Sequence, residues 1–239
     1  MLKIGNAQAT AKRPIIATSI TAQNVTELLA QMKLANASVA DVIEWRIDYL
    51  LAKQPVDSAL IRQVRQTVIK PMIFTWRTAT EGGLFGFNAK MYRKLYLLAI
   101  KAGFEAIDIE AAWLFEMTPL LTAARQHRVV VIGSYHHPKR TPNDLRAHFD
   151  KLFGAPVDVV KVATFANDAA DVDRLQTVSA DYAAHQVKPL ITMAMGSVGQ
   201  RSRLEGLRYG SELTFGALVN VSAPGQLALA DLAKHFSTH

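Results

Sequence analysis

Short apolar runs recur eight times along the chain, separated by stretches of mixed polarity. Within each run the apolar residues follow one another instead of alternating with polar ones. Continuous apolarity is typical of strands that are buried on both faces, as in a parallel sheet. The sequence therefore predicts eight strands, at residues 15–20, 41–48, 71–77, 105–110, 129–134, 158–163, 189–195 and 213–219.

Between these runs, apolar residues recur at near-helical spacing, which predicts amphipathic helices packed against a core. Asn24 precedes the first of these stripes as a favoured N-cap residue, and Gly103 follows another where a C-terminal cap belongs. Residues 82–88 and 196–210 are predicted to be loops. The stripes are Val25, Leu28, Leu29, Met32 and Leu34; Leu95, Leu98, Ala99 and Ala102; and Val172, Leu175, Val178 and Tyr182.

Eight strands alternating with helices predict an α/β fold, a single (β/α)8 TIM barrel that spans residues 1–239 as one catalytic domain. A doubly wound sheet would use the same alternation with fewer strands. No Gly-x-Gly-x-x-Gly follows the first predicted strand, which disfavours a dinucleotide-binding fold.

The charge of the chain favours a small anionic ligand over nucleic acid. Lys and Arg number 27 against 20 Asp and Glu, for a net charge of +7. These cations are scattered, and the longest local cluster is Lys139-Arg140, whereas a nucleic-acid-binding face would gather them. We therefore expect a small-molecule substrate and no nucleic-acid partner.

The chain contains no cysteine, which excludes disulfides and thiolate metal sites and fits a reducing cytoplasm. No apolar run approaches the roughly 20 residues that a membrane-spanning helix needs. Polar Lys3 and Asn6 interrupt the first ten residues, so no signal-peptide core is visible. The expectation is a cytoplasmic protein without membrane contact.

Lys161 is the most informative residue for chemistry, because it interrupts the apolar run Val-Val-Lys-Val-Ala. Burying an ammonium group is costly unless the group is paired or neutralised. A desolvated lysine with a lowered pKa is a nucleophile for carbonyl carbons, so Lys161 is a candidate for a Schiff base. The alternatives are a lysine at an exposed strand end or a lysine in a structural ion pair.

His136 ends the strand before the one that carries Lys161, where it could move protons on a carbon beside an imine. A structural histidine is the alternative. A metal site is disfavoured, because His136 and His137 would point to opposite faces and no His-x-x-x-His set accompanies them. Strand 41–48 places Glu44, Arg46 and Asp48 on one side by alternation.

Arg46, Arg77 and Arg203 follow three different predicted strands. Active sites of (β/α)8 barrels lie at the carboxyl ends of the strands, and the guanidinium fork suits carboxylates. If the three arginines converge there, they form an anion-recognising pocket around the lysine.

Seven short motifs in this order resemble those of type I 3-dehydroquinate dehydratases. The resemblance runs from about Ile15 to Gln226 and covers most of the chain. The motifs are Glu-Trp-Arg-Ile-Asp at 44–48, Thr-Trp-Arg-Thr-Ala-Thr-Glu-Gly-Gly at 75–83, Ile-Asp-Ile-Glu at 107–110, Ser-Tyr-His at 134–136, Val-Lys-Val-Ala at 160–163, Met-Gly-Ser-Val-Gly-Gln-Arg-Ser-Arg at 195–203 and Ser-Ala-Pro-Gly-Gln at 222–226.

The resemblance implies dehydration of 3-dehydroquinate to 3-dehydroshikimate, in the shikimate pathway of aromatic amino-acid biosynthesis. It implies that Lys161 forms the Schiff base, that His136 is the general acid and base, and that Glu81 orients His136. It also implies a homodimer that needs no metal and no organic cofactor. The substrate-binding residues that it implies are Arg203 for the carboxylate, Glu44, Arg46 and Arg77 for the ring hydroxyls, and Ser222 and Gln226 on a closing loop.

One departure from the family pattern follows the histidine. Family members commonly have Asp-Phe at this point, and this chain has His137-Pro138. The change concerns support of the loop more than the proton carrier itself. Two other functions stay open: another imine-forming barrel enzyme, such as a class I aldolase, and a non-catalytic barrel that binds a hydroxy acid.

Overall fold

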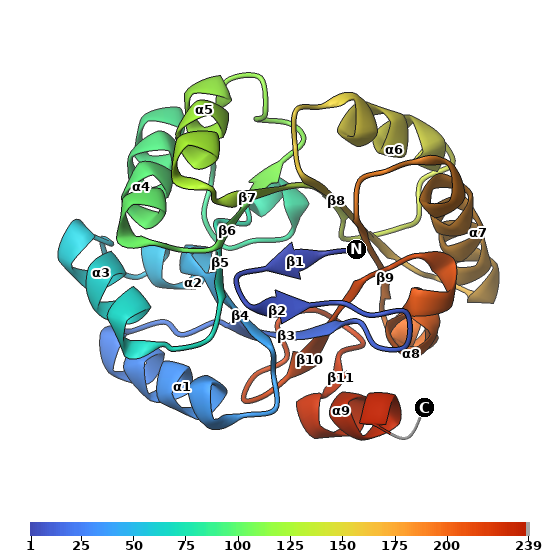
Figure 1. Cartoon of the computed structure of the whole chain (residues 1–239), viewed down its shortest axis with the longest axis horizontal. Helices are drawn as coiled ribbons and strands as arrows, with labels where there is room; N and C mark the ends of the chain where they lie inside the picture. The colour runs from blue at the N-terminus through green and yellow to red at the C-terminus, as the bar shows by residue number, and fades with distance from the viewer. Residues whose placement is uncertain (238–239) are drawn as a thin grey trace.

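A computed structural model describes residues 1–237; residues 238 and 239 of the expected domain lie outside the described residues. All eight predicted strands are present, and they form one parallel sheet that curls into a barrel with the helices outside it (Figure 1). The prediction of an α/β barrel is therefore confirmed. The eight strands are β3 (Ile15–Ile20), β4 (Val42–Arg46), β5 (Met72–Thr75), β6 (Ala106–Glu110), β7 (Val130–His137), β8 (Val159–Phe165), β9 (Leu190–Met195) and β10 (Leu213–Ala217).

The helices alternate with these strands, as the apolar stripes predict. Asn24 caps the first helix by accepting the backbone N–H of Glu27 at 2.8 Å. Gly103 ends another helix with a left-handed φ of +86°, a conformation that glycine adopts without a Cβ clash. The main helices are α1 (Val25–Ala37), α3 (Ser58–Thr67), α4 (Ala89–Ala102), α5 (Thr118–His127), α6 (Leu145–Gly154), α7 (Ala169–His185) and α9 (Leu229–Ser237).

The barrel closes between β9 and β10, where a serine side chain joins the two strands. A single bridge joins Leu190 to Ser211 ahead of β10, and the Glu212 N–H donates to the Leu190 carbonyl at 2.8 Å. The Ser211 hydroxyl accepts the Thr192 N–H at 2.9 Å and donates to the Thr192 carbonyl at 3.1 Å. This side chain thus supplies hydrogen bonds that a ladder would otherwise make.

The amino-terminal end of the barrel is plugged by a hairpin that the apolar pattern did not predict. Strands β1 (Lys3–Ile4) and β2 (Ala7–Gln8) pair antiparallel and lie across the barrel in Figure 1. Leu2 and Ile4 join a buried apolar cluster with residues at the start of the barrel strands, such as Ile73 and Ile191. This end is apolar and closed, which leaves the opposite end for polar side chains.

Several predicted strand bounds differ from the observed ones by one to three residues, and two departures change the description near the cavity. The second strand ends at Arg46, and Asp48 lies instead in the short helix α2 (Ile47–Leu51), where it is fully buried. Residues 196–210 were predicted to be a loop, but most of them form short helical turns. These are η2 (Val198–Gln200), α8 (Arg201–Glu205) and η3 (Gly206–Tyr209), and the remaining short elements of the chain are η1 (Ala79–Glu81) and β11 (Leu227–Ala228).

Candidate active site

A cavity of about 260 Å³ opens at the carboxyl ends of the barrel strands. Its lining comes from most of the barrel strands and from the loops that follow them, as expected for a (β/α)8 enzyme. The structure brings all nine predicted site residues to this one cavity. They are Glu44, Arg46, Arg77, Glu81, His136, Lys161, Arg203, Ser222 and Gln226.

Lys161 lies in the floor of the cavity and is 4% exposed, so it does not occupy an exposed strand end. Its Nζ donates to Asp108 Oδ2 at 2.9 Å and to Glu44 Oε1 at 3.4 Å. The same nitrogen lies 4.8 Å from the centre of the Phe215 ring. Two carboxylates and an aromatic face therefore compensate the burial of this ammonium group.

Both carboxylates beside Lys161 are held in the ionised state. Burial by itself would raise the pKa of Glu44, but Lys161 and Arg46 outweigh burial and lower it. Burial is likewise outweighed for Asp108, whose pKa Arg77 and Lys161 hold well below its usual range. Asp108 is a partner of the lysine that the sequence reasoning did not select, although an acidic residue within an apolar strand was a usable signal.

His136 lies on the strand next to the lysine and on the same face of the sheet. Ser134 pairs in register with Lys161, so His136 stands two residues farther along β7. The intervening Tyr135 points the other way and stacks on His148 at 3.7 Å. Burial lowers the pKa of His136 well below its ordinary value, and Arg77 and Lys161 add to the effect. The imidazole is therefore neutral at neutral pH.

Glu81 binds His136 twice through one oxygen. Its Oε2 accepts the backbone N–H of His136 at 2.9 Å and lies 3.0 Å from the ring nitrogen Nδ1. Burial raises the pKa of Glu81 well above its ordinary value, against the opposing charge of Arg77. When Glu81 is ionised, it favours the tautomer of His136 that is protonated on Nδ1, and Nε2 is then a proton acceptor.

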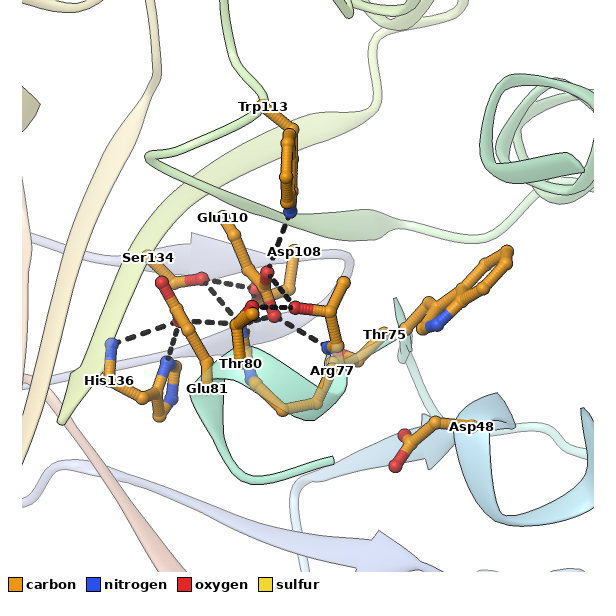
Figure 2. Close-up of polar contacts among 12 residues, drawn as sticks. Asp48, Thr75, Arg77, Thr80, Glu81, Asp108, Glu110, Trp113, Ser134 and His136 are labelled. Atoms are coloured by element: carbon orange, nitrogen blue, oxygen red, sulfur yellow. Dashed lines mark hydrogen bonds and ion pairs between the residues drawn. The ribbon is translucent and has the colours of Figure 1, made fainter. Parts of the chain in front are cut away.

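Arg77 is the centre of a buried network of charges, which Figure 2 shows beside His136 and Glu81. Its Nη2 donates to Asp108 Oδ1 at 2.8 Å, and its Nη1 donates to Glu110 Oε1 at 3.1 Å and to Ser134 Oγ at 3.0 Å. Glu81 Oε2 lies 3.3 Å from the same Nη1. Although Arg77 lines the cavity, three carboxylates engage its guanidinium group.

Arg46 is also held by a carboxylate. Its Nε and Nη2 donate to the two oxygens of Asp48 at 2.8 and 2.9 Å, and its guanidinium group lies 5.1 Å from the centre of the Tyr49 ring. Two parallel hydrogen bonds fix the plane of the guanidinium group at the cavity wall.

Arg203 differs from both of these arginines. Its Nε donates to the Gly225 carbonyl at 3.2 Å and its Nη1 lies 3.6 Å from Met193 Sδ, whereas its buried Nη2 has no hydrogen-bond partner. Burial lowers the pKa of Arg203 to about 10, which leaves it charged at neutral pH. A buried, charged group with a free donor in a cavity is suited to bind an anion.

The loop that contains Ser222 and Gln226 covers this side of the cavity. Gln226 Oε1 accepts the Ser222 N–H at 2.7 Å and lies 3.2 Å from its hydroxyl. Gly225 has a left-handed φ of +77°, and a Cβ there would lie 2.0 Å from the Gly196 carbonyl oxygen. A glycine is therefore required where this loop meets the turn after β9.

The departure at His137-Pro138 falls at the rim of the cavity. Pro138 lines the cavity and lies against Gly82, where a Cβ would be 3.3 Å from the proline ring. His137 Nδ1 accepts the backbone N–H of Arg140 at 3.2 Å. The replacement thus supports the turn at 137–140, away from the contact between His136 and Glu81.

Within residues 1–237, no three His, Cys, Asp or Glu side chains are grouped so that they could hold a metal ion. In the same part of the chain, no helix is both long enough and apolar enough to cross a membrane.

The fold and the site together define a (β/α)8-barrel enzyme with a buried lysine, a neighbouring histidine and an anion-binding arginine in one cavity. Comparison with known proteins identifies the family. The family model described as Type I 3-dehydroquinase matches residues 16–238. The chain therefore belongs to the type I 3-dehydroquinase family.

Similar proteins agree with this assignment over nearly the whole chain. A 3-dehydroquinate dehydratase from Salmonella agona is 32% identical over 230 residues, which cover 92% of this chain and 90% of that protein. The crystal structure of 3-dehydroquinate dehydratase from Geobacillus kaustophilus covers 99% of this chain and 95% of its own, with a TM-score of 0.92 and 26% identity. The structure of the Clostridium difficile enzyme with covalent modified comenic acid covers 99% and 96%, with a TM-score of 0.85 and 27% identity.

Proposed function

We propose that this chain is a carbon–oxygen lyase that dehydrates 3-dehydroquinate to 3-dehydroshikimate in the shikimate pathway, through a Schiff base on Lys161. The observation that carries the proposal is the shared cavity of Lys161, His136 and Arg203. An amine can form an imine with the ketone, a neutral imidazole can move the protons, and a free guanidinium group can bind the carboxylate of such a substrate. The family relatives carry the same activity in their names.

The first step joins the lysine to the ring ketone. The ammonium group of Lys161 first gives up a proton, and the unprotonated Nζ attacks the carbonyl carbon C3. That proton is returned to the oxygen of the resulting carbinolamine, which leaves as water, and a protonated imine remains. This cation keeps the charge that Asp108 and Glu44 already pair with at 2.9 and 3.4 Å. The carboxylates thus stabilise the covalent adduct as well as the free ammonium group.

The second step is removal of a proton from C2 by Nε2 of His136. The electron pair of the broken C–H bond moves into the imine to give a neutral enamine. His136 then returns the proton to the C1 hydroxyl, which leaves as water with the electron pair of the C1–O bond. The nitrogen lone pair of the enamine re-forms the protonated imine, and a double bond forms between C1 and C2. Water hydrolyses this imine, which releases 3-dehydroshikimate and regenerates Lys161. General acid–base help of this kind is worth about 10²–10⁴-fold in rate.

Substrate orientation follows from the charges of the cavity. Arg203 is proposed to bind the carboxylate with its free Nη2, opposite the acidic cluster around Lys161. Glu44, Arg46 and Arg77 are proposed to contact the ring hydroxyls, and Ser222 and Gln226 to close over the ligand. No step of this mechanism calls for a metal or an organic cofactor. A homodimer and a cytoplasmic location remain predictions from the family resemblance.

The test is turnover of 3-dehydroquinate, followed by the ultraviolet absorption of the conjugated enone product, in wild type, Lys161→Ala and His136→Ala. Borohydride added during turnover should attach one reduced product to Lys161 in wild type and none in Lys161→Ala. His136→Ala should still form the adduct while its kcat falls about 10²–10⁴-fold. Active wild type with no adduct on Lys161 would reject the Schiff base, and activity on phosphorylated aldoses instead would support an aldolase.

A further inference from the structure

Glu110 is a buried carboxylate that does not line the cavity and has no place in the proposed chemistry. It lies at the end of β6 with no exposed surface. Its Oε1 accepts the backbone N–H of Thr78 at 2.7 Å, and its Oε2 accepts the Thr78 hydroxyl at 2.6 Å. The Trp113 Nε1 donates to Oε2 at 2.9 Å. Four hydrogen bonds in all, with that of Arg77, satisfy this charge.

Thr78 is the residue before η1, the single helical turn that ends at Glu81. Its carbonyl accepts the N–H groups of Glu81 and Gly83 at 3.0 and 2.9 Å, so Thr78 fixes both ends of this turn. A Cβ on Gly83 would lie 1.9 Å from the Arg77 carbonyl oxygen, so the turn is packed directly against the end of β5. Glu110 thus anchors the segment that presents Glu81 to His136.

Glu110 also competes with Glu81 for one nitrogen of Arg77. Nη1 lies 3.1 Å from Glu110 Oε1 and 3.3 Å from Glu81 Oε2 (Figure 2). This nitrogen has two hydrogens and must also reach Ser134 Oγ. Without the charge of Glu110, Arg77 would draw Glu81 toward itself and away from the imidazole.

We propose that Glu110 is a positioning residue for the dehydration, which holds Glu81 on His136 by anchoring Thr78 and by sharing Arg77. This inference rests on the proposed function, in which His136 must accept a proton on Nε2. Glu110 acts on proton transfer, so its loss changes kcat more than KM. It touches neither the substrate nor the reacting atoms.

The charges around Glu81 predict how the pH dependence of the reaction changes when Glu110 is replaced. Five residues interact with Glu81: Arg77 just after β5, Asp108 and Glu110 on β6, and Tyr135 and His136 on β7. After burial, which raises the pKa of Glu81 most, the charges of Glu110 and Asp108 also raise it, while Arg77 and the His136 N–H oppose the rise. Loss of the charge on Glu110 lowers the pKa of Glu81, and ionisation of Glu81 then extends to lower pH.

The experiment compares wild type, Glu110→Gln and Glu105→Gln. Glu105 is a matched control, because it is an ion-paired carboxylate just before the same strand, at the opposite end of the barrel, where it binds Arg65 and the Met72 N–H. In Glu110→Gln, kcat for 3-dehydroquinate should fall about tenfold with KM nearly unchanged. In the profile of kcat against pH, the midpoint of the fall in activity on the acid side (the acid limb) should move down by on the order of one pH unit. In Glu105→Gln, kcat and the limb should match wild type even if the melting temperature falls.

A second measurement separates this inference from the proposed function. The imidazole shifts of His136, followed by NMR during an acid titration, report ionisation of Glu81 whether or not the protein turns over 3-dehydroquinate. A lower midpoint pH of this titration in Glu110→Gln than in wild type supports the inference. An unchanged midpoint overturns it. If Glu110→Gln does not fold, Thr78→Val removes one anchor and keeps the charge. It should lower kcat about threefold at constant KM, and wild-type kcat in Thr78→Val would overturn the proposal.

Discussion

The two sides of the cavity treat a buried arginine in opposite ways. On the side formed by β5, β6 and β7, three carboxylates surround Arg77. Burial alone would lower the pKa of Arg77, but Asp108 and Glu110 outweigh burial and raise it well above its ordinary value. On the side formed by β9 and β10, Arg203 faces a sulfur atom and a carbonyl oxygen, and burial lowers its pKa to about 10.

The difference separates a guanidinium group whose charge is neutralised by carboxylates of the protein from one whose charge is not. Both arginines are almost completely buried, at 3% and 2% exposure, so burial does not distinguish them. The cost of burying charge is met within the protein for Arg77. For Arg203 that cost is not met within the protein, which agrees with its proposed role of binding an anionic ligand.

Replacement of Arg77 should have the largest effect on stability. Arg77→Met leaves Asp108, Glu110 and Glu81 buried without their common cation, and should lower the free energy of unfolding by about 3–5 kcal/mol. Urea denaturation at neutral pH measures the loss. Arg65→Met, which breaks the more exposed pair with Glu105, is the control and should cost less. If Arg77→Met is as stable as wild type, Arg77 does not stabilise the fold by neutralising these carboxylates.

Replacement of Arg203 should weaken binding and leave stability intact. Arg203→Met removes the proposed carboxylate contact, and KM for 3-dehydroquinate should rise about 10²-fold, or about 3 kcal/mol. Because an unpaired buried charge is removed, the melting temperature of the free protein should not fall. Steady-state kinetics measures KM, and calorimetry measures the melting temperature. A lower melting temperature with an unchanged KM would reverse the assignment of the two arginines.

Acid should destabilise the protein by protonating Asp108 and Glu44, the carboxylates beside Lys161. Arg77 and Lys161 hold the folded-state pKa of Asp108 below the ordinary 3.8 in spite of burial, and Lys161 with Arg46 holds that of Glu44 below 4.5. The stability from both groups is fully present above pH 4.5 and is lost as pH falls through their folded-state pKa values. Each group contributes a slope of up to about 1.4 kcal/mol per pH unit.

Urea denaturation between pH 7 and pH 3 measures this slope. The slope of the free energy of unfolding against pH should be smaller in Asp108→Asn, which lacks one of the two carboxylates with a lowered pKa. It should keep its wild-type size in Arg203→Met, where no neighbouring carboxylate titrates. An unchanged slope in Asp108→Asn would show that acid acts elsewhere in the molecule.

The smallest effect is expected beside Arg203. Met193→Leu replaces the sulfur 3.6 Å from Nη1 with a side chain of similar volume. A thioether is a weak acceptor, so KM should change by less than about threefold, and stability by less than about 1.5 kcal/mol. A tenfold rise in KM would mean that the sulfur orients the guanidinium group.

Most of the fold was predictable because local patterns and tertiary packing agree. The uninterrupted run before Ser134 became β7, and Asn24 and Gly103 cap helices as their chemistry predicts. The prediction was wrong where packing overrides pattern. Asp48 continued the alternation of a strand, but the chain turns into α2 so that its carboxylate reaches Arg46.

The sequence predicted which residues lie in the candidate site, but it did not predict which of them contact one another. Lys161 and His136 stood out because a charged or titratable residue ended or interrupted an apolar run, and the barrel brings strand ends together. Asp108 and Glu110 offered the same signal, but their partners come from other strands. Contacts such as that of Asp108 with Lys161 join residues 53 positions apart, at a distance that no local pattern specifies.

The sequence by itself determined the order of the elements, the face of each strand and the kinds of side chain that reach the mouth of the barrel. Only the tertiary structure decided which arginine is neutralised and which is left free. The physical reason is that the energy of a buried charge depends on atoms within a few ångströms of it. For Arg77 and Arg203 those atoms are set by neighbouring strands and loops distant in the sequence.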